Sequence, residues 1–550
     1  MLRQKLAENW QWTVLCLILM LSTIYARPLI PIDETRYLSV AWEMWHSNDF
    51  LVPHINGHPY SHKPPLLFWL IHVSWLLFGV SEWSARLVGP FFAFGSVALT
   101  VHLGKILWPA NKAVRLAAPF ILLGTFVWSL YGSLTMFDAL LTFIALLALL
   151  AILAARRAAT ILPWSFLSLA IGLGILAKGP IVLLYVLPPV LLAPLWSEKD
   201  TMPWGKWYGS SFLALLAGIG IALCWAIPAA IQGGEEYRQA ILFSQTAGRM
   251  VKAFAHGRPF YWYALLLPLL YLPWFFWLPA WRGWKKKSFD AATRFCLCAL
   301  LPAFFLLSCV SGKQIHYILP LLPVSSLLIA HTVTTVPKRT PYDQVPLLVI
   351  FLMLSLALLI VPQLSLHGGD REMLQYLPKW IAVVPFSAGL FLYMTRPESM
   401  LKSVKIVSSS MLLLVILLQL ALADPLHTIY DQTVIGEKIK QAQDANKPVA
   451  VFPPKLMDQF QFSGRLLTPV TPQNTFEELV IWSVDNPQAF CLVFTKIKIN
   501  KQSKTTGIAR QYSDGWLIFS PAKDFVANYQ QWIAQPAIQS DSLNKSEPKS

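Results

Sequence analysis

Residues 31–65 hold the densest early group of side chains that could do chemistry in an otherwise apolar chain. The group begins with the acids Asp33 and Glu34, continues with Arg36, and ends in His62 and Lys63 before two prolines. Polar groups are expensive beside lipid, so such a cluster next to an apolar run is a functional hypothesis by default. A carboxylate here could act as a base, orient an acceptor or bind a metal. The alternative is an interfacial acid, solvated by water and paired with Arg36.

Two further residues have both a functional and a simpler interpretation. Asp138 begins the apolar run LTMFDALLTF, where it would face the same compartment as Asp33. A helix N-terminus also stabilises an anion, and that alone would explain an acid there. Lys63 stands before a rigid Pro-Pro pair, where it could meet a phosphate at headgroup level. A lysine that only extends its ammonium to the membrane surface is the alternative.

Basic and aromatic residues recur in two later segments. Residues 232–263 contain Arg249, His256 and Arg258 ahead of PFYWY, and SGKQIHY adds Lys313 and Tyr317. Guanidinium and ammonium groups beside aromatic rings suit a phosphate held at an interface. Attraction to anionic lipid headgroups is the alternative.

Composition places these residues in a membrane protein. Of the 550 residues, 55% are hydrophobic and 13% charged, and the mean hydropathy is +0.52. The net charge of +16 does not indicate nucleic acid, because the loops predicted to be cytoplasmic carry nearly all of the surplus, as the positive-inside rule expects. The sequence contains no Walker A, GxGxxG, GxSxG or HExxH motif. The sequence is therefore more consistent with an activated substrate that is delivered from the lipid than with a soluble nucleotide substrate.

The apolar runs predict about 13 transmembrane helices, with the N-terminus in the cytoplasm. Residues 66–80 would reach only ~22 Å as a helix, too short to span, so we predict an interfacial helix there. Counting that run as a span gives 14, an alternative that the charge bias disfavours. The predicted spans are 12–26, 87–103, 117–131, 138–157, a two-span hairpin around Lys178, 212–231, one ending at Arg282, one reaching Ser311, one returning to Lys338, 346–362, 380–393 and 407–423.

The composition changes after residue 423, which predicts a transmembrane domain over residues 1–423 and a small outer α/β domain over residues 424–535. Strands are predicted in PVAVFPP, FCLVFTK and GWLIFSP. A helix is predicted in NTFEELVIWSV, with Asn474 as its cap and Glu477 near capping-box spacing. The polar residues 536–550 predict a disordered tail.

Taken in order, PIDETRY, HKPP, the acid Asp138, LAKGP, HGRPFYWY and SGKQIHYILP resemble the polytopic glycosyltransferases with a GT-C fold. Within that group the chain resembles the bacterial lipid A aminoarabinose transferases, which are related to the protein O-mannosyltransferases. The resemblance covers the whole membrane part, and the length and the small C-terminal domain are similar too.

The resemblance implies transfer of a sugar from an undecaprenyl-phosphate carrier to a periplasmic-side acceptor. The site would lie at the outer face of a bacterial inner membrane, with the C-terminal domain and interfacial helices in the periplasm. The most specific expectation is 4-amino-4-deoxy-L-arabinose moved to lipid A or another glycolipid. Membrane lipids are the other expected partners.

The resemblance also assigns residues to roles. Asp33 and Asp138 match the catalytic acids, and Lys63, Arg258 and Tyr317 match residues at the carrier phosphate, with Glu34, Arg36, Arg249 and Lys313 in support. No cofactor is required, but a structural zinc shared by His62 and His256 is implied. The family usually has Glu before the lysine, where this chain has His62.

Three other functions stay open. A protein O-mannosyltransferase shares the early acidic motif, and a GT-C transferase for another sugar shares the whole set. A transporter of lipid-linked sugars would need the same lipid access, but it should carry paired repeats with helices broken near the membrane midplane. The sequence has no such internal symmetry, and its charged residues gather at one face.

Overall fold

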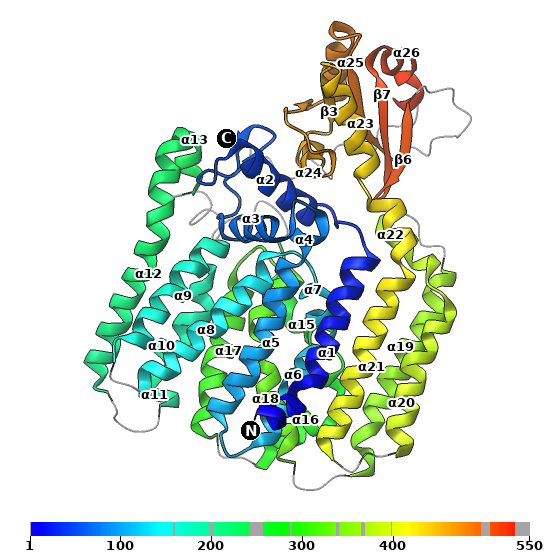
Figure 1. Cartoon of the computed structure of the whole chain (residues 1–550). Helices are drawn as coiled ribbons and strands as arrows, with labels where there is room; N and C mark the ends of the chain where they lie inside the picture. The colour runs from blue at the N-terminus through cyan, green and yellow to red at the C-terminus, as the bar shows by residue number, and fades with distance from the viewer. Residues whose placement is uncertain are drawn as a thin grey trace. The chain divides into compact units, whose positions relative to one another are not determined.

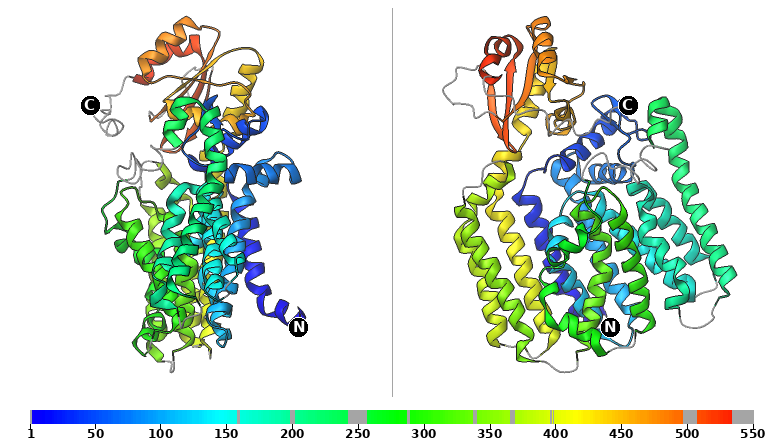
Figure 2. Two further views of the ribbon diagram at one scale, coloured as in Figure 1. Left: turned by 90° about the vertical axis from the view of Figure 1, so that its left-hand side faces the viewer. Right: turned by 180° about the vertical axis from the view of Figure 1, so that it is seen from behind.

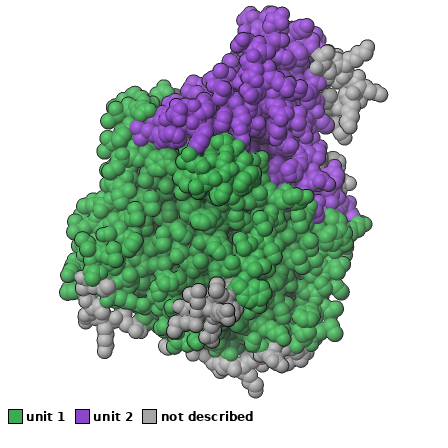
Figure 3. Space-filling model, in the orientation of Figure 1, with its two compact units in different colours: residues 1–25, 61–360, 378–420 green, residues 26–60, 361–377, 421–550 purple. Residues whose placement is uncertain are grey.

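Apolar helices form the first of two compact units in the computed structural model of the chain, and Figure 3 colours the two units. The helical unit contains Met1–Tyr25, Ser61–Ile360 and Pro378–Leu420, and the mixed unit contains Ala26–Tyr60, Val361–Leu377 and Ala421–Ser550. The structure describes residues 2–157, 160–197, 202–241, 257–286, 289–336, 340–364, 369–395, 397, 399–496 and 507–533.

Eight segments of the described residues are long and apolar enough to cross a membrane, so the chain is a multi-pass helical membrane protein. Three shorter apolar segments are Trp10–Ala26, Leu66–Phe78 and Lys379–Thr395. The eight segments contain α5 (Val88–Leu107), α8 (Phe137–Arg157), α9 (Leu162–Lys178) with α10 (Leu183–Leu191), α12 (Trp204–Gln232), α17 (Ala291–Cys309), α18 (Leu322–Thr334), α19 (Val345–Ile360) and α21 (Met400–Ala421). The shorter segments contain α1 (Leu2–Ala26), α3 (Leu66–Phe78) and α20 (Val383–Thr395).

Two of the predicted spans are each broken into shorter helices. Residues 117–131 divide into α6 (Lys112–Leu123) and α7 (Phe126–Tyr131), with the break at Gly124. A Cβ on Gly124 would lie 2.7 Å from the Cα of Ser408, so the chain passes too close to α21 for a larger residue. The span that ends at Arg282 divides into α15 (Trp262–Leu270) and α16 (Leu278–Arg282) around Pro273, which cannot donate a helical hydrogen bond.

The predicted hairpin around Lys178 is confirmed by contacts at both ends of α8. The end of α9 meets the start of α8, because the Lys178 Nζ lies 2.6 Å from the Asp138 Oδ1. The chain reverses at Gly179, which has a positive φ of 76°. It then returns to the far end of α8, where the Arg156 Nε donates to the Ser197 Oγ after α11 (Ala193–Trp196).

Small residues bring α9 and α12 close together. A Cβ on Gly172 would lie 2.7 Å from the Ile221 side chain, and one on Gly218 would lie 2.7 Å from that of Ile171. Membrane helices associate largely through such close van der Waals packing. The helix that carries Lys178 is thus held between α8 and α12 (Figure 1).

The short helix α3 does not run parallel to the long helices. Figures 1 and 2 both show it lying crosswise at one end of α5, α8 and α9. A short turn joins it to α4 (Glu82–Arg86), and the Ser74 Oγ of α3 donates to the Ser84 carbonyl of α4 at 2.6 Å. This orientation agrees with the prediction of an interfacial helix rather than a span.

The C-terminal part of the mixed unit is a five-stranded sheet in the order β4-β3-β5-β7-β6. The strands are β3 (Val449–Phe452), β4 (Thr471–Pro472), β5 (Phe490–Thr495), β6 (Ile508–Tyr512) and β7 (Gly515–Pro521). Strands β3, β4 and β5 are parallel, and β7 is antiparallel to both β5 and β6. The three predicted strands are confirmed, whereas β4 and β6 were not predicted.

Helices cover both faces of this sheet, because successive strand residues point to opposite sides. Val449 and Val451 pack with α23 (Thr433–Asp444), which in turn contacts α24 (Gln461–Gly464), whereas Ala450 packs with α25 (Phe476–Asp485) and α26 (Ala522–Ile533). The segment η10 (Pro454–Asp458) follows β3 directly, and α22 (Ala423–Tyr430) precedes α23.

The cap predicted for α25 is wrong by one residue. The Thr475 Oγ1, rather than Asn474, accepts the N–H of Glu478, and a Glu478 carboxylate oxygen accepts the N–H of Asn474. Both residue types cap helices well, so the choice depends on where the backbone leaves its extended conformation. That happens at Thr475, which has a φ of −122° and a ψ of 162°.

The mixed unit also contains α2 (Asp33–Ser47) and a hairpin of β1 (His54–Ile55) and β2 (His58–Pro59). Asn56 and Gly57 form the hairpin turn with φ of 52° and 77°, as a two-residue turn of this kind requires. The two carboxylate oxygens of Glu43 accept the N–H groups of Asn56 and Gly57. The hairpin is thereby fixed to α2.

Candidate functional site

The centre of the site in the helical unit is a buried ion pair. Asp138 stands in the first turn of α8, and Lys178 is the last residue of α9. Their side chains are 3% and 7% exposed, and the Lys178 Nζ lies 2.6 Å from the Asp138 Oδ1. A buried charge is tolerated only when it is paired, so each side chain fixes the other.

Aromatic side chains and a histidine surround this pair. The His316 Nε2, on the segment η5 (Ile315–Leu321), lies 3.8 Å from the Asp138 Oδ2. The His316 ring stands 4.9 Å from the Tyr317 ring and 5.7 Å from the Tyr131 ring. Asp138 therefore faces an ammonium with one oxygen and an imidazole with the other.

Two of the residues predicted at the carrier phosphate, Tyr317 and Lys63, belong to the same cluster. The Lys178 ammonium lies 4.4 Å from the centre of the Tyr317 ring, and the Tyr185 hydroxyl donates to the Tyr317 carbonyl. Lys63 lies 5.7 Å over the Phe137 ring and interacts electrostatically with Asp138. Two ammonium groups beside one carboxylate leave this end of the unit positive, which suits an anion.

The predicted basic loop is joined to the segment that precedes η5. Gly257 forms a bridge with Gly312, and the Arg258 N–H donates to the Ser311 carbonyl. The Lys313 ammonium donates to the Arg258 carbonyl at 3.0 Å, so it fixes the loop. The Arg258 residue is exposed, and its guanidinium lies 5.9 Å from the centre of the Trp262 ring.

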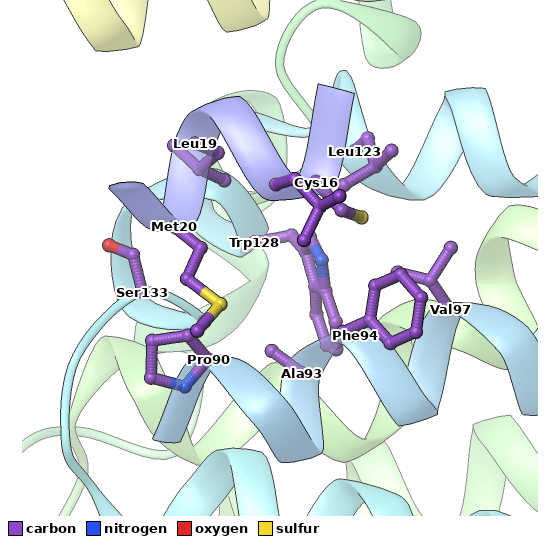
Figure 4. Close-up of a pocket in the computed structure, with 12 residues that line it drawn as sticks. Cys16, Leu19, Met20, Pro90, Ala93, Phe94, Val97, Leu123, Trp128 and Ser133 are labelled. Atoms are coloured by element: carbon purple, nitrogen blue, oxygen red, sulfur yellow. The ribbon is translucent and has the colours of Figure 1, made fainter. Parts of the chain in front are cut away.

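An apolar pocket in the same unit lies apart from the predicted site residues. It is formed by α1, α5 and the α6–α7 region, and Figure 4 shows the Met20 side chain pointing toward Pro90. None of the residues that line it was predicted in the site. Most of the residues that line it are apolar, so the pocket suits an apolar group.

The acidic motif lies in the mixed unit, at the start of α2. Asp33 is partly exposed, and one of its oxygens accepts the Tyr37 hydroxyl at 3.2 Å. Glu34 is buried and bonded to the Arg27 guanidinium, and it also accepts the Ile30 N–H at 3.1 Å. Asp33 is thus the acid of this motif that remains partly open to solvent.

The alternative in which the acids pair with Arg36 is wrong. The Arg36 Nε donates instead to the Asp458 Oδ2 at 3.0 Å. Residues two apart on a helix do not face each other, so Glu34 and Arg36 reach different partners. In the described contacts, neither Glu34 nor Arg36 bonds the Asp33 carboxylate, so their predicted support of Asp33 stays a prediction.

Two predicted residues, Arg249 and His256, lie outside the described residues. His62, the other predicted zinc ligand, is exposed. The described ranges contain no group of three His, Cys, Asp or Glu side chains arranged to hold a metal. A structural zinc normally has four protein ligands, so the described side chains alone do not form such a site.

Sequence reasoning missed Lys178 and His316 as partners of Asp138. The sequence predicts only a hairpin turn at Lys178, and it predicts no separate role for His316 within SGKQIHY. A signal for Lys178 was available, because the predicted topology places it at the same face as Asp138. No sequence signal distinguished His316 from the neighbouring polar residues.

The sequence comparisons find similarity to known glycosyltransferases. The family described as dolichyl-phosphate-mannose-protein mannosyltransferase matches residues 62–231. The undecaprenyl phosphate-alpha-4-amino-4-deoxy-L-arabinose arabinosyl transferase of Pectobacterium atrosepticum is 29% identical over 58% of this chain and 57% of its own length. Its counterpart in Pseudomonas aeruginosa is 30% identical over 54% of each chain. The chain thus spans a little over half the length of the relatives it matches.

Solved structures establish the fold of nearly the whole chain. ArnT from Cupriavidus metallidurans in the apo state matches with a TM-score of 0.76 and 17% identity, over 94% of this chain and 99% of that protein. The same protein bound to undecaprenyl phosphate matches with a TM-score of 0.73 and 18% identity, over 94% and 98%. The chain therefore has the fold of a polytopic membrane glycosyltransferase. That fold is the ArnT fold, and the resemblance identified from the motifs is confirmed.

Proposed function

We propose that this protein is an inner-membrane glycosyltransferase that moves a sugar from an undecaprenyl-phosphate carrier to a periplasmic-side acceptor. The most specific form is transfer of 4-amino-4-deoxy-L-arabinose to lipid A. The observation that carries the proposal is the buried Asp138–Lys178 pair beside Tyr317, with the partly exposed Lys63 as a second ammonium of the same cluster. It places fixed positive charge at one end of the long helices, in a chain with the ArnT fold.

The topology belongs to the proposal. About 13 membrane passages place the N-terminus in the cytoplasm and the C-terminal domain, residues 424–535, in the periplasm. The eight long segments count as nine passages, because α9 and α10 form a hairpin. The broken helices α6–α7 and α15–α16 add one each, and so do Trp10–Ala26 and Lys379–Thr395. The clusters at Asp33 and Asp138 then belong to the periplasmic side, and Arg156 to the cytoplasmic side, in agreement with the positive-inside rule.

Donor binding is assigned to the cationic residues. Lys63, Arg258 and the Tyr317 hydroxyl hold the carrier phosphate, and Arg249 and Lys313 support them. Transfer breaks the bond between the anomeric carbon and the phosphate oxygen, so negative charge grows on the departing undecaprenyl phosphate. Positive groups already fixed there stabilise that charge, which is usually the largest single contribution to catalysis.

The two acids have different assignments. Asp33 orients the acceptor, whose oxygen attacks the anomeric carbon with inversion as the phosphate leaves. A lipid A phosphate is already an anion and needs only positioning, whereas a hydroxyl acceptor must lose its proton to Asp33. Asp138 holds Lys178 beside Tyr317 and so keeps a positive charge in the donor site.

This chemistry requires no metal, because lysine and arginine supply the positive charge. A zinc held by His62 and His256 would have a structural role, with further ligands beyond the described clusters. Elemental analysis of the purified protein tests this. Zinc near one per chain, reduced in His62→Ala, supports the site, and a zinc-free, active wild type rules it out.

Mass spectrometry of lipid A from cells with and without the protein tests the function. We expect a mass increment of one aminopentose on lipid A phosphates only in cells that contain the protein. Unchanged lipid A would contradict the most specific form. A second candidate is transfer to a polypeptide, which the match to protein mannosyltransferases favours. Sugar found on a protein rather than on lipid A would establish that alternative.

A further inference from the structure

The helix that carries Asp33 is bound to residues more than 400 positions later in the chain. The Thr35 Oγ1 donates to the Gln459 Oε1 at 2.7 Å, and the Arg36 Nε donates to the Asp458 Oδ2 at 3.0 Å. Further along α2, the Trp42 Nε1 donates to the Leu466 carbonyl at 2.9 Å. The chain segments 26–60 and 421–550 accordingly form parts of one unit.

The β1–β2 hairpin, which follows α2, is also bonded to the C-terminal segment of the chain. The Asn56 Nδ2 donates to the Val470 carbonyl at 2.9 Å, and the Asn56 Oδ1 accepts the Val470 N–H at 2.8 Å. These two bonds fix the hairpin beside Val470, the residue directly before β4. Glu43 fixes the hairpin in turn to α2.

Two of the contacts lie next to Asp33. Thr35 and Arg36 belong to the same first turn of α2, and Asp458 and Gln459 come directly after β3 through η10. Thr35 and Gln459 are each 2% exposed, so their bond is shielded from water. The direction of the Asp33 side chain is therefore tied to the core of the C-terminal sheet.

These contacts suit positioning better than a general contribution to stability. The described contacts of Asp33 include only the Tyr37 hydroxyl, from its own helix. Its placement therefore depends on the orientation of α2. A displacement of about 1 Å at a reacting group can cost about 100-fold in rate.

We infer that the C-terminal domain holds Asp33 in its working position through Asp458 and Gln459, which are positioning residues for sugar transfer. The inference rests on the proposed function. It makes the domain a part of the transferase that the reaction needs, rather than an attachment with a separate role.

The test uses two single variants of the full-length protein, Asp458→Ala and Gln459→Ala. We expect kcat for transfer to fall about tenfold or more, with KM for the lipid-linked donor changed less than about threefold, because α2 shifts but the donor-binding cations stay. Asp444→Ala is the matched control, since Asp444 pairs with Lys440 on the exposed surface of α23 in the same domain. This control should keep wild-type kcat and the same thermal midpoint as Asp458→Ala.

A charge exchange separates positioning from folding. Arg36→Glu alone should lose activity, and Arg36→Glu with Asp458→Arg should recover most of it, because the pair is restored with opposite polarity. Wild-type kcat in Asp458→Ala would overturn the inference. So would a loss of activity that merely follows a fall in the thermal midpoint and is not recovered by the exchange.

Amide hydrogen exchange provides a readout independent of activity. In Asp458→Ala the amides of α2 should exchange faster, while those of α23 stay unchanged. Equal exchange of α2 in variant and wild type would overturn the inference. If the wild-type protein transfers no sugar to lipid or protein, the proposed function fails. Faster amide exchange of α2 in Asp458→Ala would then still show that Asp458 holds α2 in place, without a role in sugar transfer.

Discussion

Replacing either partner of the Asp138–Lys178 pair is expected to lower sugar transfer by about 100-fold or more. Asp138→Asn leaves the buried Lys178 without its counter-charge, and Lys178→Met removes the ammonium that lies 4.4 Å over the Tyr317 ring. Both changes remove or misplace a positive charge assigned to the donor phosphate. Transfer to lipid A, normalised to folded protein, measures the effect.

The double variant Asp138→Asn with Lys178→Met distinguishes a catalytic pair from a structural one. Breaking a buried ion pair on one side costs about 3–5 kcal/mol, whereas neutralising both partners is often close to neutral for stability. The double variant should therefore regain the wild-type thermal midpoint. It should nevertheless stay inactive, with an effect no greater than that of the single variants, because the two residues act as one unit.

The matched control is another ion pair with a buried carboxylate. Arg282 at the end of α16 bonds Asp343, whose side chain is 3% exposed, the same as that of Asp138. Arg282→Met with Asp343→Asn should keep transfer within about twofold, as expected for residues away from the chemistry. Full activity of the Asp138/Lys178 double variant would show that the pair only stabilises the fold.

The sequence could predict which face the charged residues share, but not which of them touch. Topology placed Asp138 and Lys178 at one end of the helices. Their contact depends on the rotation of α9 about its own axis, which the close packing at Gly172 and Gly218 sets. That packing is a property of two helices together, and neither helix's hydropathy pattern reports it.

Contacts between segments that are distant in the sequence could not be predicted either. The strands β3, β5 and β7 were predictable because each is a mostly buried run of β-formers bounded by polar residues, Gly or Pro. The two-residue strand β4 is too short to show any alternation. The attachment of α2 to Asp458 joins residues 422 positions apart, so local pattern carries no sign of it.

Asp33→Asn is expected to abolish transfer, with activity at least about 1000-fold lower, while the protein stays folded. The change keeps the shape of the side chain and leaves an oxygen for the Tyr37 hydroxyl, which donates at 3.2 Å. It removes the negative charge that orients an acceptor or takes its proton. The lost interaction with the α2 N-terminus is worth only about 0.3–1 kcal/mol, so the thermal midpoint should move little.

Asp424→Asn supplies the control, because Asp424 also stands in the first turn of a helix of the mixed unit, α22. It loses the same charge and the same interaction with a helix N-terminus, and it should keep transfer within about twofold. Reconstituted membranes with purified donor and lipid A allow both variants to be compared at equal amounts of folded protein. Activity of Asp33→Asn close to that of Asp424→Asn would remove Asp33 from the chemistry. The role assigned to Asp458 would fall with it, because a positioning residue has no function once the group it positions is not needed.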